Sequence, residues 1–546
     1  MGAWVARVGR GAAVLLLGAL PPMVEMAALV GFGLGAAQAL APQSTATWPY
    51  DSYHDLRWLL VYHDSWLTFV AGLVAVVAAR GVLSAGLTAL SWPAEVPRPS
   101  MRQLVRRNVE VAALATVIIS PWAAISVAFS AVALSWYLLA SVVPLLVIAP
   151  FLQRAGVTAH WWKGLPSVQL LLWSVVNFLV ITAAGAVIVS VPQWWRVPVA
   201  GLAGVANGLL WRVTVTAAVR HERPRWAAVP VTPVAIILTM ATAVAAPSLI
   251  SVASGTTGQW RPPVTVEPLP ASVPYAVVVL AGFESSWDGQ LPADPRVAHF
   301  SYAGVTQDGR PLPYPPEATH RSLDSSAVLL AAQVDALHRR TRRPVALLGE
   351  SEGALVIRTY LEKFSHGPVR AALLFSPLIW PGRAYYPPPG HEGWGTAAGW
   401  ELRLIAALTN LTKAVDASPD EPFVRSVMVE APFYRNRILC PVPGIRMMAF
   451  LPLVSAAEAP SGEYSRIPVV EVPALHGGLL NRRAIHERAM RFLSGQPVTQ
   501  PWRGYVVLQR LGAAWQSPPL VLAVNPLWST AREGDPALSG RICQPR

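Results

Sequence analysis

Long apolar runs in the first half of the chain constrain its fold more than any other feature of the sequence. A helix needs about 20 apolar residues to cross the roughly 30 Å hydrocarbon layer of a bilayer. Only 13% of all residues are charged, against about 25% in a typical soluble domain. We therefore predict a multi-pass α-helical membrane domain over residues 1–253. Its seven expected spans are 12–40, 66–91, 109–132, 134–153, 167–190, 197–219 and 228–252.

Three ionisable residues fall inside these apolar runs: Glu25, Arg80 and Arg212. Charged side chains are unfavourable in lipid and often mark functional sites there. The alternative is that both arginines extend to the cytoplasmic surface and that Glu25 pairs with one of them. We favour this alternative because no internal repeat or pair of broken helices marks a transport site.

The positive charges of the first half predict its orientation. Arginines gather in the loops 92–108, 154–166 and 220–226, whereas the loop 41–65 holds three aspartates. By the positive-inside rule the N-terminus is cytoplasmic, and an odd number of spans places everything after residue 252 outside the membrane. The net charge of +13 is thus spread over loops, unlike a nucleic-acid-binding face. The scarcity of lysine among the basic residues is typical of a GC-rich bacterial genome, and we expect a bacterial cell-membrane protein.

The second half reads as a soluble α/β domain. A proline-rich linker is expected at 254–274, the domain itself at 275–500, and a C-terminal tail packed on that domain at 501–546. Apolar strands alternate with helical patterns, which predicts a mostly parallel sheet with helices on both faces. The expected strands are 275–282, 343–349, 369–377, 445–453 and 467–473, and the expected helices are 322–341, 352–363 and 479–494.

Two further features of this half leave alternatives open. The segment 381–438 interrupts the alternation and is too long for a plain loop, so we interpret it as an inserted cap. The two cysteines of the chain, Cys440 and Cys543, both follow the last span. An oxidising compartment would permit a disulfide between them, and two free thiols are the alternative.

The sequence Gly349-Glu350-Ser351-Glu352-Gly353 follows an expected strand and opens an expected helix. A serine on such a sharp strand-to-helix turn has an exposed hydroxyl. Glycines on either side permit strained backbone angles and close packing of the helix on the strand. The helix N-terminus favours negative charge that develops nearby. The alternative is an ordinary serine in a glycine-flanked loop.

In this context the region 275–495 resembles the α/β-hydrolase superfamily, and within it the lipase-like and esterase-like serine hydrolases. The resemblance implies Ser351 as the nucleophile and His476, between the last strand and the last helix, as the base. It implies Glu458 as the acid, with Glu463 as the second choice. The backbone N–H groups of Phe283 and Glu352 would form the oxyanion hole. The chain departs from the family at Ala281, where histidine is common, and in the two glutamates beside the serine.

Those flanking glutamates raise a separate hypothesis. Two carboxylates beside the nucleophile would raise the pKa of His476 or disfavour anionic substrates. The other histidines of this half are interpreted differently: His486 as a solvated surface residue of the last helix, and His391 as part of the cap.

We therefore expect a membrane-tethered, extracytoplasmic serine hydrolase that cleaves ester bonds of lipid or cell-envelope substrates. The main alternative is a catalytically impaired hydrolase-fold protein that binds or scaffolds a partner. A transporter with an accessory soluble domain is a third possibility. The sequence has no dinucleotide fingerprint, phosphate-binding loop or metal-ligand cluster, so we expect no cofactor.

Overall fold

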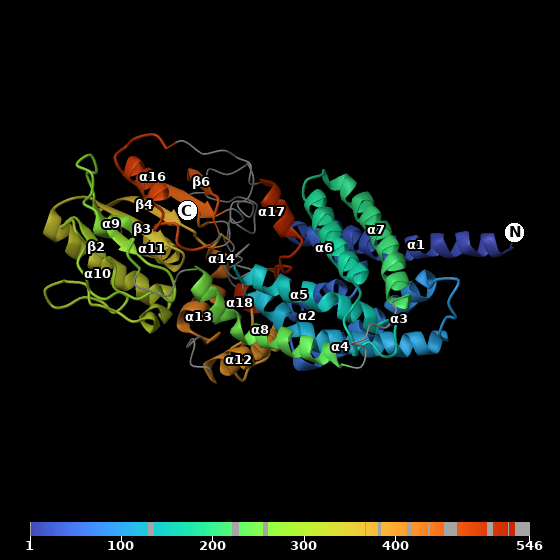
Figure 1. Cartoon of the computed structure of the whole chain (residues 1–546). Coiled ribbons are helices and arrows are strands. Elements are labelled where there is room, and N and C mark those ends of the chain that lie inside the picture. The colour runs from blue at the N-terminus through green and yellow to red at the C-terminus, as the bar shows by residue number, and fades with distance from the viewer. Residues whose placement is uncertain are drawn as a thin grey trace.

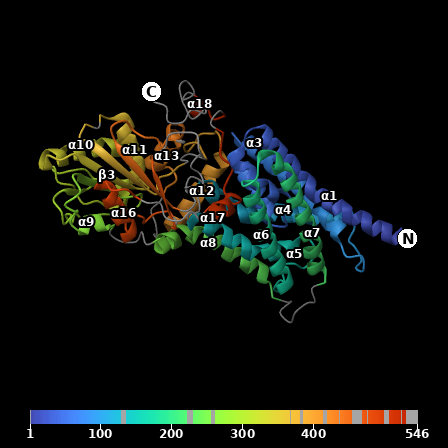
Figure 2. The same cartoon turned by 90° about the horizontal axis from the view of Figure 1, so that it is seen from above.

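A computed structural model of the chain describes residues 2–128, 136–220, 229–254, 260–365, 367–379, 384–411, 418–434, 437–452, 467–474, 476–498, 506–521 and 524–529. The chain forms a helical domain from its first half and a sheet domain from its second half, which lie side by side along one long axis (Figure 1). The view from above shows the N-terminus at the end of the helical domain that lies away from the sheet (Figure 2).

The long helices of the helical domain follow the predicted apolar runs. They are α1 (Gly2–Gly31), α3 (Trp66–Ser91), α4 (Met101–Ala128), α5 (Trp136–Ala155), α6 (Val168–Ile188), α7 (Gln193–Val219) and α8 (Val231–Ser254). Among the described residues, five of them are long and apolar enough to cross a membrane, namely α1, α3, α4, α6 and α7. The apolar stretches found in α5 and α8, Val142–Ala155 and Val231–Thr242, are shorter. The structure thus supports a membrane protein with five such helices, and the count of seven stays a prediction.

The segment between the first two long helices differs from the expected surface loop. The 3₁₀ helix η1 (Gly35–Thr45) and helix α2 (Tyr50–Val61) are almost wholly buried. Their polar groups have partners on α6 and α7: Thr47 N and Oγ1 donate to Asn177 Oδ1 over 3.0 and 2.9 Å, and Asn207 Nδ2 donates to the Pro42 carbonyl over 2.7 Å. Because these hydrogen bonds satisfy the buried polar groups, a polar segment can lie inside the helical domain.

The sheet domain contains one six-stranded parallel sheet in the order β2-β1-β3-β4-β5-β6. Its strands are β1 (Ala276–Leu280), β2 (Val297–His299), β3 (Val345–Glu350), β4 (Val369–Phe375), β5 (Arg446–Pro452) and β6 (Val469–Val472). The five predicted strands are confirmed. The short edge strand β2 was not predicted, because three residues leave too little pattern in the sequence.

Both faces of the sheet are covered by helices. Alternate residues of a strand point to opposite faces, so Ala276, Val278 and Leu280 join one buried cluster and Val277 and Val279 join the other. The first face is covered by α10 (Leu323–Thr341) and α11 (Glu352–Lys363), and the second by α16 (Arg483–Leu493) and the short helix α9 (Pro263–Val266). The described part of the expected extended linker, 260–274, therefore contains a helical turn and packs on the sheet domain, where Val264 and Val273 are fully buried.

The expected cap joins the two domains. Its helices are α12 (Thr396–Leu411), α13 (Pro422–Val429) and α14 (Ala431–Tyr434). Helix α12 packs on α4 and α8 of the helical domain, while α13 packs on α10 of the sheet domain. At the start of α12, Ala397 N donates to His63 Nε2 over 2.8 Å. The insertion is thus a structural bridge between the two domains.

The described part of the C-terminal tail lies partly on the helical domain and partly on the insertion of the predicted 275–500 domain, whereas packing on that domain alone was expected. Helix α17 (Val506–Ala513) packs on α6, the ring of Trp515 stacks on Phe178 at 4.6 Å, and Gln43 Nε2 donates to the Ala514 carbonyl over 2.5 Å. The tail is held by the helical domain because its aromatic and backbone polar groups find partners there. Further along, α18 (Pro526–Ser529) lies against the insertion, where Trp528 Nε1 donates to the Met428 carbonyl over 2.8 Å.

Candidate active site

Ser351 lies on a strained turn between β3 and α11. Its backbone has φ of 55° and ψ of −111°, a conformation that is rare for a residue other than glycine. Both flanking positions require glycine because neighbouring backbone lies too close for a side chain. A Cβ on Gly349 would lie 2.5 Å from Gly353 C, and a Cβ on Gly353 would lie 2.8 Å from the Ala281 carbonyl oxygen. Strain of this kind persists where the surrounding structure enforces it, often at active sites.

His476 follows β6 and reaches the serine. Its Nε2 lies 2.8 Å from Ser351 Oγ, within hydrogen-bond distance although 125 residues separate the two in sequence. Both residues follow the carboxyl ends of strands in one parallel sheet, and those ends meet at one edge of the sheet. Burial lowers the pKa of His476 to about 4, so its imidazole is neutral at pH 7. The serine and the histidine thus have the geometry and charge state of a nucleophile and its general base.

Glu350, the residue before the serine, holds the loop that carries the histidine. Its side chain is buried, and its Oε1 accepts a hydrogen bond from Leu479 N over 2.5 Å. Burial raises the pKa of Glu350 to about 7, against the opposing effect of the hydrogen bonds that the carboxyl accepts. The loop gains a second contact at Ser376, whose Oγ lies 3.4 Å from Gly477 N. The positions of nucleophile and base are therefore linked through Glu350.

The loop after β1 lies beside the nucleophile. A Cβ placed on Gly282 would lie 3.1 Å from Ser351 Cβ and 3.7 Å from its Oγ. Tyr302 fixes the start of this loop by donating from its hydroxyl to the Ala281 carbonyl over 2.8 Å. Within the described residues, neither Phe283 N–H nor Glu352 N–H donates to a protein group. Both predicted oxyanion donors are thus unpaired on segments that adjoin Ser351.

Glu352 does not act as a charged neighbour of the serine. Its side chain is fully buried, and within the described part of the chain neither carboxyl oxygen has a hydrogen-bond partner. Burial raises the pKa of Glu352 well above its usual value, with a further contribution from Glu284. The hypothesis that the flanking glutamates raise the pKa of His476 is therefore wrong, because that pKa is lowered by burial; their effect on anionic substrates stays a prediction.

The acid of the expected triad cannot be assigned to a described residue. Glu458 and Glu463 both lie outside the described residues, in the segment that follows β5. Within the described part of the chain, His476 Nδ1 is buried and has no hydrogen-bond partner. The residue directly after β4 is Ser376, which has no carboxylate. The nucleophile and the base are brought together, and the acid stays a prediction.

Aromatic side chains connect the loop after β1, which carries Phe283, to the insertion. The Phe283 ring stacks on His320 and on Phe423 of α13, with 5.1 Å between ring centroids in both cases. His320 Nε2 in turn lies 2.6 Å from Glu284 Oε1, and its Nδ1 lies 3.4 Å from Glu421 Oε2 at the start of α13. The insertion therefore contacts the loop after β1 through Phe423, and its role as a cap stays a prediction.

The remaining predicted residues lie away from this site or outside the described part of the chain. Cys440 is disulfide-bonded, and Cys543, the one other cysteine in the sequence, lies outside the described residues. His391 is exposed, as expected of a cap residue, whereas His486 is buried with 8% of its surface exposed and is no solvated surface residue. Among the described residues, no three His, Cys, Asp or Glu side chains are grouped so that they could hold a metal ion.

Sequence reasoning missed two supporting parts of the site. Glu350 was interpreted as a charge beside the nucleophile, although its place as the last residue of a buried strand predicts a buried side chain. The pairing of Glu284 and His320 has no signal in the sequence, because 36 residues separate the two and only the fold brings them together.

No protein-family model, curated protein or solved structure gives a significant match to this chain. The site is therefore interpreted from its own geometry.

Proposed function

We propose that the protein is a serine hydrolase with Ser351 as its nucleophile and His476 as its general base. The observation that carries this proposal is the 2.8 Å contact between Ser351 Oγ and His476 Nε2 on a strained turn. The strand order around it also supports the α/β-hydrolase fold: the serine follows the central strand β3, the predicted acid segment follows β5, and the histidine follows β6.

The reaction would proceed in two steps. Ser351 Oγ attacks the carbonyl carbon of an ester while His476 Nε2 takes the hydroxyl proton, and the N–H groups of Phe283 and Glu352 stabilise the oxyanion. When the tetrahedral intermediate collapses, its bond to the leaving oxygen breaks and His476 gives that oxygen the proton. Water then attacks the acyl-serine with His476 again as the base, which releases the acid and restores the serine.

We infer that the substrate is an ester of a membrane lipid or of the cell envelope. Support comes from the insertion, since α12 lies on the helical domain while α13 covers the oxyanion loop through Phe423. A membrane-embedded helical domain would thus hold the site close to the bilayer. The distribution of arginines supports a cytoplasmic N-terminus and an extracytoplasmic site, and the N-terminus lies at the far end of the helical domain from the sheet (Figure 1).

The test is labelling of the purified full-length protein with a fluorophosphonate, which reacts with activated serines. Wild type and the matched control Ser365→Ala, which changes an exposed serine, should both be labelled, whereas Ser351→Ala should not. Hydrolysis of short-chain and long-chain p-nitrophenyl esters then tests the substrate class. Phe423→Ala should reduce the rate on long chains more than the rate on short ones.

A binding or scaffolding function is the second candidate. It is favoured by one observation, the absence of a partner for His476 Nδ1 within the described residues, since a triad without its acid is a weak catalyst. If wild-type protein unfolds cooperatively and yet shows neither labelling nor ester hydrolysis, the hydrolase proposal is wrong and this second function is favoured.

A further inference from the structure

Ionisable side chains gather where α1, α2 and α3 meet, inside the helical domain. The cluster consists of Glu25, Asp51, His54, Asp55, Arg57 and Arg80. Arg80 does not extend to the surface, as the sequence suggested, but is 8% exposed and bound to Asp55. Within the described part of the chain, Glu25 makes its close ion pair with His54, at 2.9 Å. The favoured alternative is therefore wrong for Glu25 and Arg80, whereas Arg212 is exposed, as that alternative expects.

His54 lies between two carboxylates that come from different helices. Its Nε2 is 2.9 Å from Glu25 Oε1 on α1, and its Nδ1 is 3.0 Å from Asp55 Oδ1 on its own helix, α2. A neutral imidazole has a single N–H and donates one hydrogen bond. Its second nitrogen would then direct a lone pair at a carboxylate oxygen. An imidazolium removes this repulsion because both of its nitrogens donate.

Asp55 is also held by the arginine of the third helix. Arg80 Nε donates to Asp55 Oδ2 over 2.8 Å, and Arg80 Nη2 donates to Asp55 Oδ1 over 2.6 Å. A third bond, from Arg80 Nη1 to the Ser44 carbonyl over 2.6 Å, ties the pair to η1, a segment that has no ionisable residue of its own. Glu25, His54, Asp55 and Arg80 thus form one continuous chain of charge-assisted contacts.

The charges of the cluster balance only if it holds a proton. Three carboxylates face two arginines, because Asp51 Oδ2 lies 3.6 Å from Arg80 Nη1 and Arg57 is fully buried nearby. With a neutral His54 the cluster carries one net negative charge, which is unfavourable away from water. With a protonated His54, three anions match three cations.

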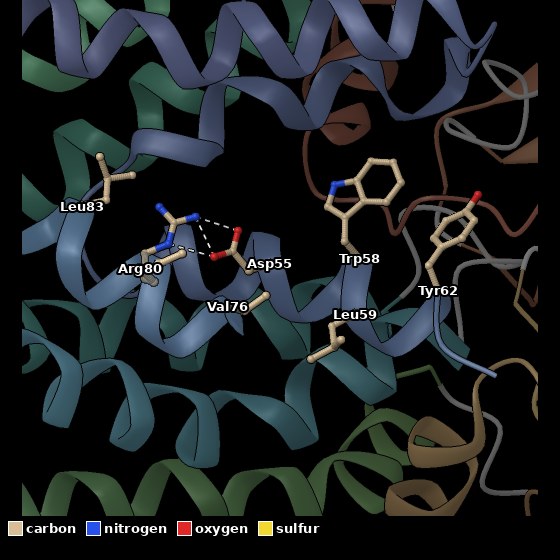
Figure 3. A pocket seen from close by; sticks show the side chains of 8 residues that line it. Asp55, Trp58, Leu59, Tyr62, Val76, Arg80 and Leu83 are labelled. Carbon is tan, nitrogen blue, oxygen red and sulfur yellow. Dashed lines mark hydrogen bonds and ion pairs between the residues drawn. The ribbon is translucent and has the colours of Figure 1, made fainter. Parts of the chain in front are cut away.

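A pocket of about 460 Å³ connects this cluster to the surface of the helical domain. Asp55 and Arg80 form its polar end, and their side chains face one another there (Figure 3). Trp58 on α2 and Tyr62 just after it also line the pocket (Figure 3). The exposed Ala79 lines it from α3. The Asp55 carboxylate, which contacts His54, therefore borders the pocket and is 15% exposed.

We propose that the helical domain contains a proton-binding site, in which His54 holds a proton between Glu25 and Asp55. The pocket is the route by which this proton exchanges. Charged side chains inside membrane domains commonly serve ion or proton sites. The proposal goes beyond ester hydrolysis, because it gives the helical domain a function other than anchoring. It makes no use of Ser351 or His476.

The first test is nitrogen NMR of the full-length protein in lipid nanodiscs, with histidine labelled at both ring nitrogens. At pH 7.5 one histidine should have both nitrogens protonated, and this signal should be missing in His54→Gln. The control His160→Gln removes an exposed histidine and should remove only a neutral signal. A neutral ring for His54 at pH 7.5 overturns the proposal.

Two further variants keep the test valid if His54→Gln fails to fold. Asp55→Asn leaves two carboxylates for two arginines, so His54 should become neutral at pH 7.5; a ring that stays doubly protonated contradicts the charge balance. Ala79→Phe fills the pocket and should slow proton exchange of the His54 signal by at least about tenfold. An unchanged exchange rate would show that the pocket is not the route.

Discussion

His476 in the sheet domain and His54 in the helical domain are both held by hydrogen bonds, yet their partners give the two rings opposite charge states. His476 faces a neutral hydroxyl, and burial lowers its pKa to about 4. His54 faces a carboxylate at each nitrogen. Burial disfavours the charged form of a ring, whereas adjacent anions favour it. The same side chain is thus suited to proton abstraction in one domain and to proton binding in the other.

The two sites also differ in how the fold assembles them. Ser351, His476 and Phe283 come from turns at the ends of strands whose order and direction are set by one parallel sheet. In the helical domain, Asp51, His54 and Asp55 come from successive turns of α2, because residues three or four apart share a helix face. Packing of three helices then brings in Glu25 and Arg80. A sheet edge positions a few reacting groups, whereas helix faces gather a larger charged cluster.

The strongest test of this comparison replaces each histidine in turn. His476→Ala should lower kcat/KM for p-nitrophenyl ester hydrolysis by about ten-thousandfold, the usual effect of removing a triad member. His54→Gln should leave kcat/KM within about twofold of wild type, because the helical cluster makes no contact with the site. Initial rates at pH 8 measure both. A large loss in His54→Gln would mean that the two sites are coupled.

The next largest effect is expected on stability in the helical domain. Arg80→Ala removes the arginine that faces Asp51 and one of the two cationic partners of Asp55. Breaking a buried ion pair in this way destabilises a protein by about 3–5 kcal/mol. The matched control is Arg106→Ala, which breaks an ion pair whose partners are 83% and 62% exposed and should change stability by less than about 1 kcal/mol. Thermal unfolding in detergent measures the difference. Equal effects would refute the buried cluster.

Much of the sheet domain could be predicted from the sequence because its signals are local. Each buried strand is a continuous apolar run, and the Gly-x-Ser-x-Gly turn marks the proposed nucleophile within five residues. Even the choice of His476 over His486 follows from its position between the last strand and the last helix, and the structure places His476 beside the serine. The order of strands and helices along the chain predicts this contact, because the carboxyl ends of parallel strands all lie at one edge of the sheet.

The helical cluster could not be predicted in the same way. Residues 41–65 look like a polar loop, because their hydrogen-bond partners Asn177 and Asn207 lie more than a hundred residues away in the sequence. Arg80 looks like an arginine that extends to the surface, because its partner Asp55 belongs to that supposed loop. Which side chains of two helices meet depends on how each helix is rotated about its axis and shifted along it. The hydropathy of the sequence does not determine either.

A smaller effect is expected at Glu350, which links the segments that carry Ser351 and His476. Glu350→Ala leaves Leu479 N–H buried without an acceptor, which should destabilise the protein by about 1–3 kcal/mol. It should also lower kcat/KM by about tenfold to a hundredfold, because the loop that carries His476 loses its anchor. Glu350→Gln keeps an oxygen acceptor and should lie within a few fold of wild type. Similar losses in both variants would show that the charge of Glu350 matters, and not its hydrogen bond.

The smallest expected effect is a shift in the pH at which kcat/KM falls to half of its maximum on the acid side. His476 acts as a base only when neutral, so kcat/KM should stay level as the pH falls from 8 to about 5 and should halve near pH 4, where its lowered pKa lies. An unperturbed histidine would give a midpoint near 6.5. Rates measured briefly after a pH jump separate titration from unfolding. A midpoint at or above 6.5 would mean that an anion such as the predicted acid Glu458 faces His476. The charge states of His54 and His476 would then differ less than their described partners indicate.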